Sequence, residues 1–291
     1  MIAIVVPTIP ARKEIFDKFM EAWQPLFDKH EVEFIKVLDG ELPKLQHREQ
    51  VFTTNDVMGR YDDCLTNFNA GIRNLGFAYI AKYLPEVEYI ITLDDDVVPI
   101  GDSIQDHLDA LNKRVCVSWM STIVDEYPRG FPYCLRDEAE VVLSHGVWEG
   151  VADWDAATQL VKGSHREVEF FKGPIPKGVY FSVCSMNIAF KRKLLPYIYQ
   201  APWAEGIKRY DDILTGVECK REIDKNGWAA VSGYARVYHE RASDVFTNLI
   251  NEAPGLRINE TFWSGDEEHK YFKVYRDKYK LWREFIEKCQ T

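Results

Sequence analysis

The sequence lacks the short signatures of several large enzyme classes. It contains neither a GxGxxG nor a GxxxxGK[ST] loop, which weakens the case for a dinucleotide-dependent dehydrogenase or a P-loop enzyme. It also contains no GxSxG elbow and no HExxH pair, the marks of α/β-hydrolases and zinc metalloproteases. Without a glycine-rich phosphate cradle, any bound diphosphate has to be held by a metal ion and arginines.

Paired cysteines and long apolar runs are missing as well. The six cysteines form no CxxC pair and no disulfide-type spacing, which favours reduced thiols and a cytoplasmic protein. No run approaches the length of a membrane span, and "MIAIVVPTIP" turns at two prolines, so we expect a first strand there rather than a signal peptide. A net charge of −10 argues against nucleic acid as the main partner. It leaves room for a phosphorylated small molecule.

The first hundred residues alternate between apolar runs and helical patterns. This alternation predicts parallel strands joined by right-handed crossovers, hence an α/β fold with a doubly wound, mainly parallel sheet flanked by helices. After residue 115 the pattern loosens. The expected strands span 2–8, 32–40, 87–93, 115–124 and 178–192, and the expected helices span 13–27, 65–84, 156–163 and 209–227.

No linker or repeat divides the chain, so we expect a single domain over residues 1–291. Its nucleotide-binding half is expected at about 1–115, its sugar or acceptor half at about 116–246, and a C-terminal helix at about 265–289. That last helix carries an apolar stripe that we expect to pack on its own domain, although a contact between subunits of a homo-oligomer is the alternative. The stripe consists of Tyr271, Tyr275, Tyr279, Trp282 and Ile286.

Three consecutive aspartates, Asp94, Asp95 and Asp96, follow the apolar run at 87–93. Adjacent carboxylates repel one another, and a hard divalent cation such as Mg²⁺ or Mn²⁺ offsets that repulsion. In open α/β sheets, ligands bind beyond the carboxyl ends of the strands, where these aspartates are expected. A solvated acidic loop is the alternative. The position favours a metal that bridges protein carboxylates and a substrate diphosphate.

Later segments carry a more specific signal. They are "RGFPYCLRDE" (129–138), "HGVWEGVADWDAATQLVKG" (145–163), "MNIAFKRKLLP" (186–196), "RYDDILTG" (209–216) and "YHERASDVF" (238–246). Together with "IVVPTI", "VLDG" and "TLDDD", these segments resemble the reversibly glycosylated polypeptide family, whose plant members are UDP-arabinopyranose mutases. The resemblance covers the chain from about Ile2 to Phe246 and implies a GT-A-type glycosyltransferase fold.

The resemblance also implies a set of site residues. Asp94, Asp96 and His239 would bind a divalent metal, Mn²⁺ or Mg²⁺. The shift of the early arginine, Arg12, away from the family's position leaves it without an implied role. The residues expected on the nucleotide side are Thr8, Asp39, Arg73, Asp94 and Asp95.

Four further residues are expected to be catalytic. Arg129 and Arg136 match two arginines of the family, the first reversibly glycosylated and the second needed for activity, and guanidinium groups suit diphosphate binding. Surface arginines paired with Asp137 and Glu138 are the alternative. Asp211 and Asp212 are expected to include one residue that binds sugar or transfers a proton, although carboxylates there also serve as helix caps.

The resemblance implies a UDP-sugar mutase that interconverts pyranose and furanose forms, with UDP-L-arabinose the expected substrate. A metal-dependent glycosyltransferase, including one that glycosylates itself, is the main alternative. A non-catalytic subunit that binds sugar nucleotides is the second.

Overall fold

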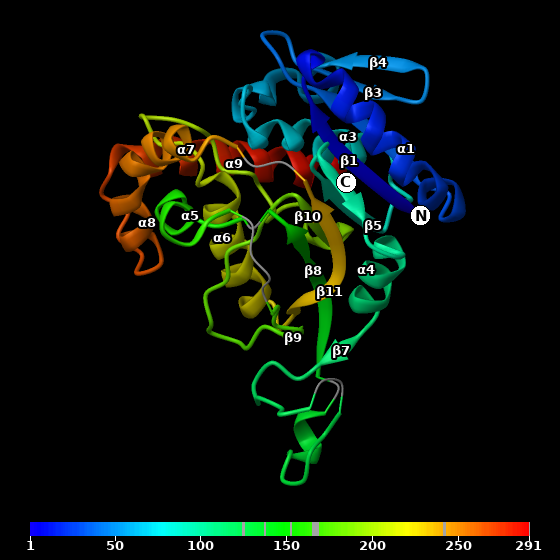
Figure 1. The fold of residues 1–291 in the computed structure, drawn as a ribbon, viewed down its shortest axis with the longest axis vertical. Helices are drawn as coiled ribbons and strands as arrows, with labels where there is room; N and C mark the ends of the chain where they lie inside the picture. Colours follow the sequence, from blue (N-terminus) through cyan, green and yellow to red (C-terminus); the bar gives the residue numbers. More distant parts are fainter. Residues whose placement is uncertain (124–125, 137, 152, 165–168, 241–242, 291) are drawn as a thin grey trace.

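The computed structural model describes residues 1–291 apart from 124–125, 137, 152, 165–168, 241–242 and 291 (Figure 1). Its described strands form one large sheet in the order β4-β3-β2-β1-β5-β10-β8-β11-β6, with β9 added beside β11 and β7 beside β8. The strands are β1 (Ile2–Thr8), β2 (Glu33–Leu38), β3 (Lys44–His47), β4 (Gln50–Thr53), β5 (Tyr89–Leu93), β6 (Val97–Pro99), β7 (Arg114–Val115), β8 (Ala139–Gly150), β9 (Gly173–Pro174), β10 (Asn187–Lys191) and β11 (Ala229–His239).

The sheet is mixed rather than mainly parallel. Strands β1, β2 and β5 are parallel as the alternation predicts, and β8 is parallel to β11. Strand β10, however, runs antiparallel between β5 and β8, and the β3–β4 hairpin extends the other edge. Periodicity indicates that a strand exists but does not give its direction, so the antiparallel insertion was not visible in the sequence. The predicted α/β fold flanked by helices is confirmed.

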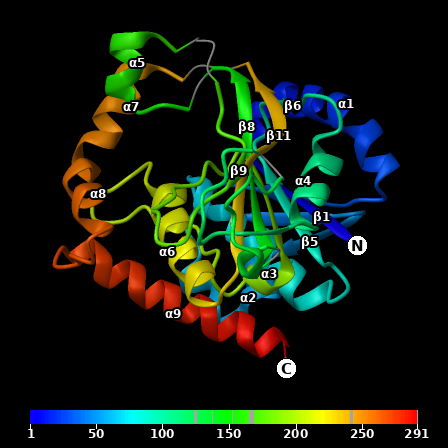
Figure 2. The ribbon, with the colours of Figure 1, turned by 90° about the horizontal axis from the view of Figure 1, so that it is seen from below.

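Two apolar clusters, one on each face of the sheet, form the core. Figure 2 shows α1 and α4 on one side and α6, α8 and α9 on the other. Helix α1, expected at 13–27, buries Phe16, Phe19, Trp23 and Phe27 against one face of the sheet. The helices are α1 (Lys13–Lys29), α2 (Thr54–Met58), α3 (Arg73–Tyr83), α4 (Ser103–Leu111), α5 (Ala156–Lys162), α6 (Asp211–Lys225), α7 (Val245–Glu252), α8 (Leu256–Phe262) and α9 (Lys270–Gln290).

Helix α9 packs on its own chain, as its apolar stripe predicts. All five stripe residues are buried, and the indole of Trp282 donates a hydrogen bond to the Leu195 carbonyl at 2.9 Å. Tyr271 adds a bond from its hydroxyl to the carbonyl of Pro202. The apolar stripe of α9 therefore packs against its own chain.

Several expected elements are shorter in the structure. The helix expected at 65–84 begins only at Arg73, because Asn69 accepts a bond from the backbone of Gly71 and residues before it leave the helical conformation. The strand expected at 115–124 forms only as β7, and the one expected at 178–192 only as β10. Residue 124 lies outside the described residues. No helix in the described part of the chain is long and apolar enough to cross a membrane.

The strand directions bring five carboxyl ends to one edge of the sheet. Because β10 is antiparallel to both β5 and β8, strand β8 points the same way as β5, and β11 follows β8. The ends of β1, β2, β5, β8 and β11 therefore meet at that edge. The opposite end of β8 begins next to β7 and to a projection, residues 118–136, that extends away from the body (Figure 1).

Candidate functional site

The acidic triplet lies at the carboxyl edge of the sheet, as predicted, but its three members face different surroundings. Asp95 is buried and accepts a 2.6 Å hydrogen bond from the hydroxyl of Thr8, at the end of β1. Its other oxygen lies 2.8 Å from the guanidinium of Arg12. Burial raises the pKa of Asp95, and Thr8 and Arg12 oppose that rise. Asp95 thus holds the β1 and β5 ends together rather than facing the cavity.

Arg73 organises the second carboxylate. Its guanidinium is buried, forms an ion pair with Asp94 and donates to the hydroxyl of Thr92 at 3.0 Å. Thr92 in turn donates to the carbonyl of Val5, so the arginine is fixed against two strands. Burial lowers the pKa of Arg73, but a guanidinium stays charged at any physiological pH. One oxygen of Asp94 is thereby neutralised and oriented.

Asp96 and His239 meet from the ends of β5 and β11. Arg12 forms an ion pair with one oxygen of Asp96, while the other oxygen lies 3.8 Å from Nε2 of His239. The Nδ1 of His239 lies 3.1 Å from the carbonyl oxygen of Val151. A carbonyl only accepts, so Nδ1 carries a proton, and Nε2 is the ring nitrogen that faces Asp96. A gap of 3.8 Å is too long for a hydrogen bond and suits two ligands of one cation.

A second acidic group lies in the same cavity. Ligand atoms of Asp153, Cys184 and Asp212 lie within 4.8 Å of one another. Asp212 accepts bonds from the backbone of Ser185 at 3.2 Å and of Ile213 at 2.9 Å. Burial, reinforced by neighbouring carboxylates, raises the pKa of Asp212 to about 8. This side chain therefore keeps a proton near neutral pH.

Asp211, the neighbour of Asp212, is buried, and burial raises its pKa too. Its Oδ2 atom has no hydrogen-bond partner among the described residues. Neither aspartate caps helix α6: the capping position is Tyr210, and no side chain bonds there. The structure therefore does not use them as helix caps.

Both acidic groups line one cavity of about 960 Å³. Its walls are of mixed character, with Trp148, Phe181 and Trp203 among the apolar contributors. Eight carboxylates and three arginines line it, and each arginine is already in an ion pair with a carboxylate of the wall. The carboxylates are Asp94, Asp96, Asp153, Asp155, Asp211, Asp212, Glu252 and Glu260.

Asp39 lies beside this cavity rather than in its wall. Its Oδ1 accepts bonds from the backbone of Gly40 and Phe68, at 2.8 Å and 2.9 Å. Burial raises its pKa. Asp39 thus ties the loop that carries Asn69 and Ala70, both of which line the cavity, to the end of β2.

The structure does not bring Arg129 and Arg136 to this cavity. Both belong to the projection at the amino end of β8, whereas β8 contributes His145 and Trp148, from its carboxyl half, to the cavity wall, and neither arginine lines it. Arg136 stacks on Tyr133, with its guanidinium carbon 3.9 Å from the ring centre. Asp137, its alternative partner, lies outside the described residues.

Sequence reasoning missed several residues of the cavity. Arg12 was left without a role, yet it bridges Asp95 and Asp96. Its proximity to the triplet follows from the β1–β5 pairing, which places the loop after Thr8 beside the end of β5. Asp153 and Cys184 lie outside the helices and strands, so no periodic pattern in the sequence predicts that they line the cavity.

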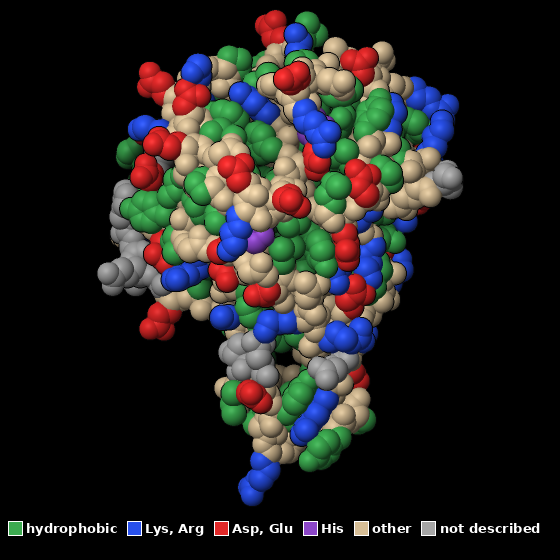
Figure 3. All heavy atoms as spheres, turned by 90° about the vertical axis from the view of Figure 1, so that its right-hand side faces the viewer, with side chains coloured by type: hydrophobic (Ala, Val, Ile, Leu, Met, Phe, Trp, Pro, Cys, Tyr) green, Lys and Arg blue, Asp and Glu red, His purple; other side chains and the backbone are tan. Residues whose placement is uncertain are grey.

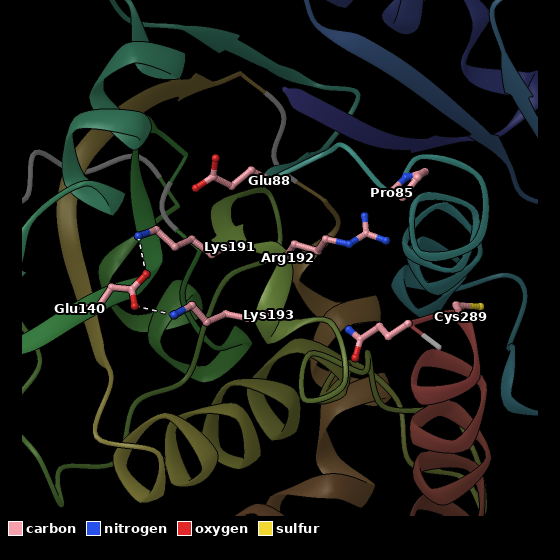
Figure 4. Close-up of a pocket in the computed structure, with 8 residues that line it drawn as sticks. Pro85, Glu88, Glu140, Lys191, Arg192, Lys193 and Cys289 are labelled. Atoms are coloured by element: carbon pink, nitrogen blue, oxygen red, sulfur yellow. Dashed lines mark hydrogen bonds and ion pairs between the residues drawn. The ribbon is translucent and has the colours of Figure 1, made fainter.

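A second cavity, of about 530 Å³, shares no residue with the first, and its charged side chains bond to groups of the protein itself (Figure 4). Lys191 and Lys193 both bond to Glu140 there. Arg192 points to helix α3 and donates to backbone carbonyls at its end, including that of Leu84 at 2.8 Å. These contacts support the helix and the sheet, so we assign this cavity no chemistry.

The comparisons with known proteins bear on the chain as a whole. The family model described as reversibly glycosylated polypeptide matches residues 1–265. The chain belongs to the reversibly glycosylated polypeptide family. Members of this family with similar sequences include Arabidopsis thaliana "Probable UDP-arabinopyranose mutase 4", 32% identical over 284 residues, which are 88% of this chain and 74% of that protein. Another is Arabidopsis thaliana "UDP-arabinopyranose mutase 1", 31% identical over 292 residues, 90% of this chain and 76% of that protein.

The similarity of this chain to solved structures is weaker than its similarity to these relatives. A Drosophila β1,4-galactosyltransferase 7 mutant in complex with manganese, UDP-Gal and xylobiose aligns with a TM-score of 0.36 at 14% identity. The alignment covers 79% of this chain and 63% of that one.

Proposed function

We propose that this protein is a UDP-sugar mutase that interconverts the pyranose and furanose forms of UDP-L-arabinose. The observation that carries the proposal is the approach of Asp96 and His239 to 3.8 Å in a cavity that Asp94 also lines, in a chain about 31% identical to a UDP-arabinopyranose mutase. Residues 1–115 would supply most of the nucleotide side and residues 116–246 the sugar side. We also propose a cytoplasmic location.

The donor set fits a divalent cation. Asp96 and His239 would hold Mn²⁺ or Mg²⁺, and Asp94, which lines the same cavity with one oxygen paired to Arg73, would add negative charge beside it. When bound, the cation would neutralise charge on the diphosphate as the bond to the sugar breaks. The bond from Nδ1 of His239 to the Val151 carbonyl supports this assignment, since it fixes the ring with Nε2 toward Asp96.

The arginines have a supporting part in the cavity. Arg12 and Arg73 hold Asp96 and Asp94 in place, and their remaining N–H groups add positive charge on the nucleotide side. When the bond between the anomeric carbon and the phosphate oxygen breaks, its electron pair leaves with UDP. Fixed positive charge near that oxygen lowers the barrier because it need not reorganise during the step.

Asp211 and Asp212 lie on the sugar side. A protonated Asp212 donates a hydrogen bond to a sugar oxygen, which a carboxylate could not do. The unpartnered Oδ2 of Asp211 accepts a bond from a sugar hydroxyl. In the freed sugar the oxygen of the 4-hydroxyl bonds to the anomeric carbon while the bond from that carbon to the former ring oxygen, O5, breaks, and the proton of the 4-hydroxyl ends on O5. UDP then re-attacks the anomeric carbon with the electron pair that it took when it left.

A nuclear magnetic resonance time course tests this function. UDP-arabinopyranose is incubated with the protein, with Mn²⁺ present or chelated and without any acceptor. We expect a furanose anomeric signal that depends on the metal and is absent in the Asp96→Ala variant. Release of free arabinose and UDP would instead support transfer chemistry. Metal-dependent turnover of Asp96→Ala would contradict the metal assignment.

A further inference from the structure

The cavity at the carboxyl edge of the sheet has little positive charge to offer an anion. Eight carboxylates line it against three arginines, and no lysine is among the described residues of its wall. Burial lowers the pKa of His145 to about 3, so this histidine adds no charge near neutral pH. On the face of the body drawn in Figure 3, acidic and basic side chains lie interspersed. A bound diphosphate therefore depends on single, well-placed cations rather than on a basic surface.

Two of the three wall arginines use their guanidinium groups to hold the protein together. The four terminal nitrogens of Arg12 and Arg73 all bond to a carboxylate or to a backbone carbonyl of the chain. The Arg73 side chain is only 3% exposed. These two arginines order the acidic triplet, and little of their hydrogen-bonding capacity is left for a ligand.

The third wall arginine, Arg209, lies two residues before α6 and is bound differently. Its Nε donates to Oε1 of Glu252 at 3.1 Å, while its two terminal nitrogens have no hydrogen-bond or ion-pair partner among the described residues. Its side chain is 34% exposed, about a tenfold larger fraction than for Arg73. The free edge of a guanidinium presents two parallel N–H groups, and these match two oxygens of a phosphate. Arg209 can therefore bind an anion while Glu252 holds it in place.

Glu252 is itself fixed on α7. Its carboxylate is buried, and Oε2 accepts a 2.8 Å hydrogen bond from the backbone of Ala156, the first residue of α5. Its backbone carbonyl accepts a 3.3 Å bond from the hydroxyl of Tyr210. Each carboxylate oxygen thus has one partner, and the partner on the cavity side is Nε of Arg209. This arrangement orients the guanidinium and leaves its terminal nitrogens available.

The backbone of Arg209 has an uncommon conformation. Its φ of 61° lies in the left-handed region, which costs conformational free energy in a residue that has a Cβ. A bridge between Ala204 and Ile207 fixes the turn before it, and Tyr210 after it is buried in the core. Consecutive side chains are thereby directed to the cavity wall and to the core. Strained residues of this kind concentrate at ligand-binding sites.

We propose that Arg209 binds the diphosphate of the nucleotide sugar through its two terminal nitrogens, with Glu252 as its positioning residue. Arg209 lies near the expected junction of the nucleotide and sugar sides. Burial raises the pKa of Asp211, and the charges of both Arg73 and Arg209 are among the influences that oppose this rise, so both cations lie close to that aspartate. The inference rests on the proposed function for the identity of the ligand as a nucleoside diphosphate.

Equilibrium binding of UDP and of uridine, each with Mn²⁺ present, tests the assignment. UDP carries the diphosphate and uridine lacks it, so we expect Arg209→Gln to weaken UDP binding by about 10- to 100-fold and to leave uridine binding unchanged. Arg209→Lys should recover only part of the loss, because an ammonium group does not match two phosphate oxygens. Arg257→Gln, at an exposed position on α8 outside the cavity wall, is the matched control and keeps wild-type affinity. Wild-type UDP affinity in Arg209→Gln would overturn the proposal.

A double variant separates ligand binding from a structural role. Arg209→Gln also leaves the buried Glu252 carboxylate without its cation, which weakens the contact between α7 and α5. In Arg209→Gln/Glu252→Gln, two amides replace the ion pair and no buried charge is left unpaired, so thermal stability should return toward the wild type. We expect UDP binding to stay weak in this variant, because no cation faces the diphosphate. Recovery of UDP affinity would show that Arg209 acts only by supporting Glu252, contrary to the proposal.

These outcomes are distinct from those of the mutase assay. Weak UDP binding in Arg209→Gln, combined with a wild type that does not convert UDP-arabinopyranose, would contradict the proposed mutase and support the diphosphate assignment. Conversion by the wild type, combined with unchanged UDP affinity in Arg209→Gln, would contradict the assignment alone.

Discussion

Arg12 forms ion pairs with both Asp95 and Asp96, linking the turn after β1 to the acidic triplet after β5. One of these carboxylates is buried and the other lines the cavity, so a single guanidinium couples the stability of the strand ends to the geometry of the site. Its removal leaves the Asp95 carboxylate buried, with Thr8 as its remaining side-chain partner among the described residues. Such a group is costly to leave unpaired.

We therefore expect Arg12→Ala to lower kcat/KM by roughly 10- to 100-fold, equivalent to about 1.4 to 2.7 kcal/mol of transition-state stabilisation. Arg12→Lys recovers only part of this, because one ammonium group cannot form both ion pairs in forked geometry. Steady-state kinetics with UDP-arabinopyranose measures the effect. Lys13→Ala, which removes an exposed pair with Asp17, is the control and retains wild-type kinetics. Full activity in Arg12→Ala would show that the site does not depend on this bridge.

His239→Ala is expected to weaken Mn²⁺ binding by about 10- to 100-fold, as the loss of one ligand or of its orientation does. The remaining aspartates still attract the cation, so binding is reduced rather than abolished. Titration followed by electron paramagnetic resonance of free Mn²⁺ gives the dissociation constant without reference to turnover. His269→Ala, at an exposed position before α9, is the matched control. Equal Mn²⁺ affinity in the two variants would remove His239 from the metal site.

Trp282→Phe is expected to destabilise the fold without changing the chemistry. The indole is fully buried and donates to the Leu195 carbonyl, so the variant leaves a small cavity and an unsatisfied acceptor. The combined cost is about 2 kcal/mol or more in the free energy of unfolding. Urea unfolding measures it, and kcat/KM should stay at the wild-type value. Trp263→Phe, half exposed, is the control and should cost little. Equal stability of the two variants would contradict the packing role of α9.

The sequence was informative where a local pattern decides the structure. The apolar run before Asp94 predicts a strand, and the edge rule for α/β sheets then places the triplet at a ligand-binding edge, where it lies. The burial of Trp282 and of the tyrosines in its stripe is predicted by their helical spacing alone. In each case the residues of one helix or strand, and their periodicity, were sufficient for the prediction.

Tertiary placement was less predictable. Cys184 joins Asp153 and Asp212 only because three separate segments converge at the cavity. The direction of β10 depends on its neighbours in the sheet, not on its own residues. For Arg129, motif order suggested a place in the site, yet its distance along β8 appears only when the strand is built. Such relationships depend on contacts between residues far apart in sequence.

The raised pKa of Asp212 predicts a pH dependence for the proposed turnover. Burial and the neighbouring Asp211 and Asp153 raise its pKa to about 8, so turnover that uses its proton falls as pH rises through about 8. Stability changes in the same direction: between about pH 4, where an unfolded aspartate ionises, and about pH 8, the native state holds a proton that the unfolded state has released. Stability therefore decreases with rising pH across that window. Both effects arise from the raised pKa of Asp212.

Asp212→Asn separates the two effects. The amide still donates a hydrogen bond but does not titrate, so the decrease in stability between about pH 4 and pH 8 should become shallower. The fall in kcat above about pH 8 should disappear, leaving a lower but flatter profile. Thermal unfolding and kcat, each measured from pH 5 to 9, check this, with Asp224→Asn on the same helix α6 as the control. A kcat profile in Asp212→Asn that still falls above about pH 8 would assign the titration to another group.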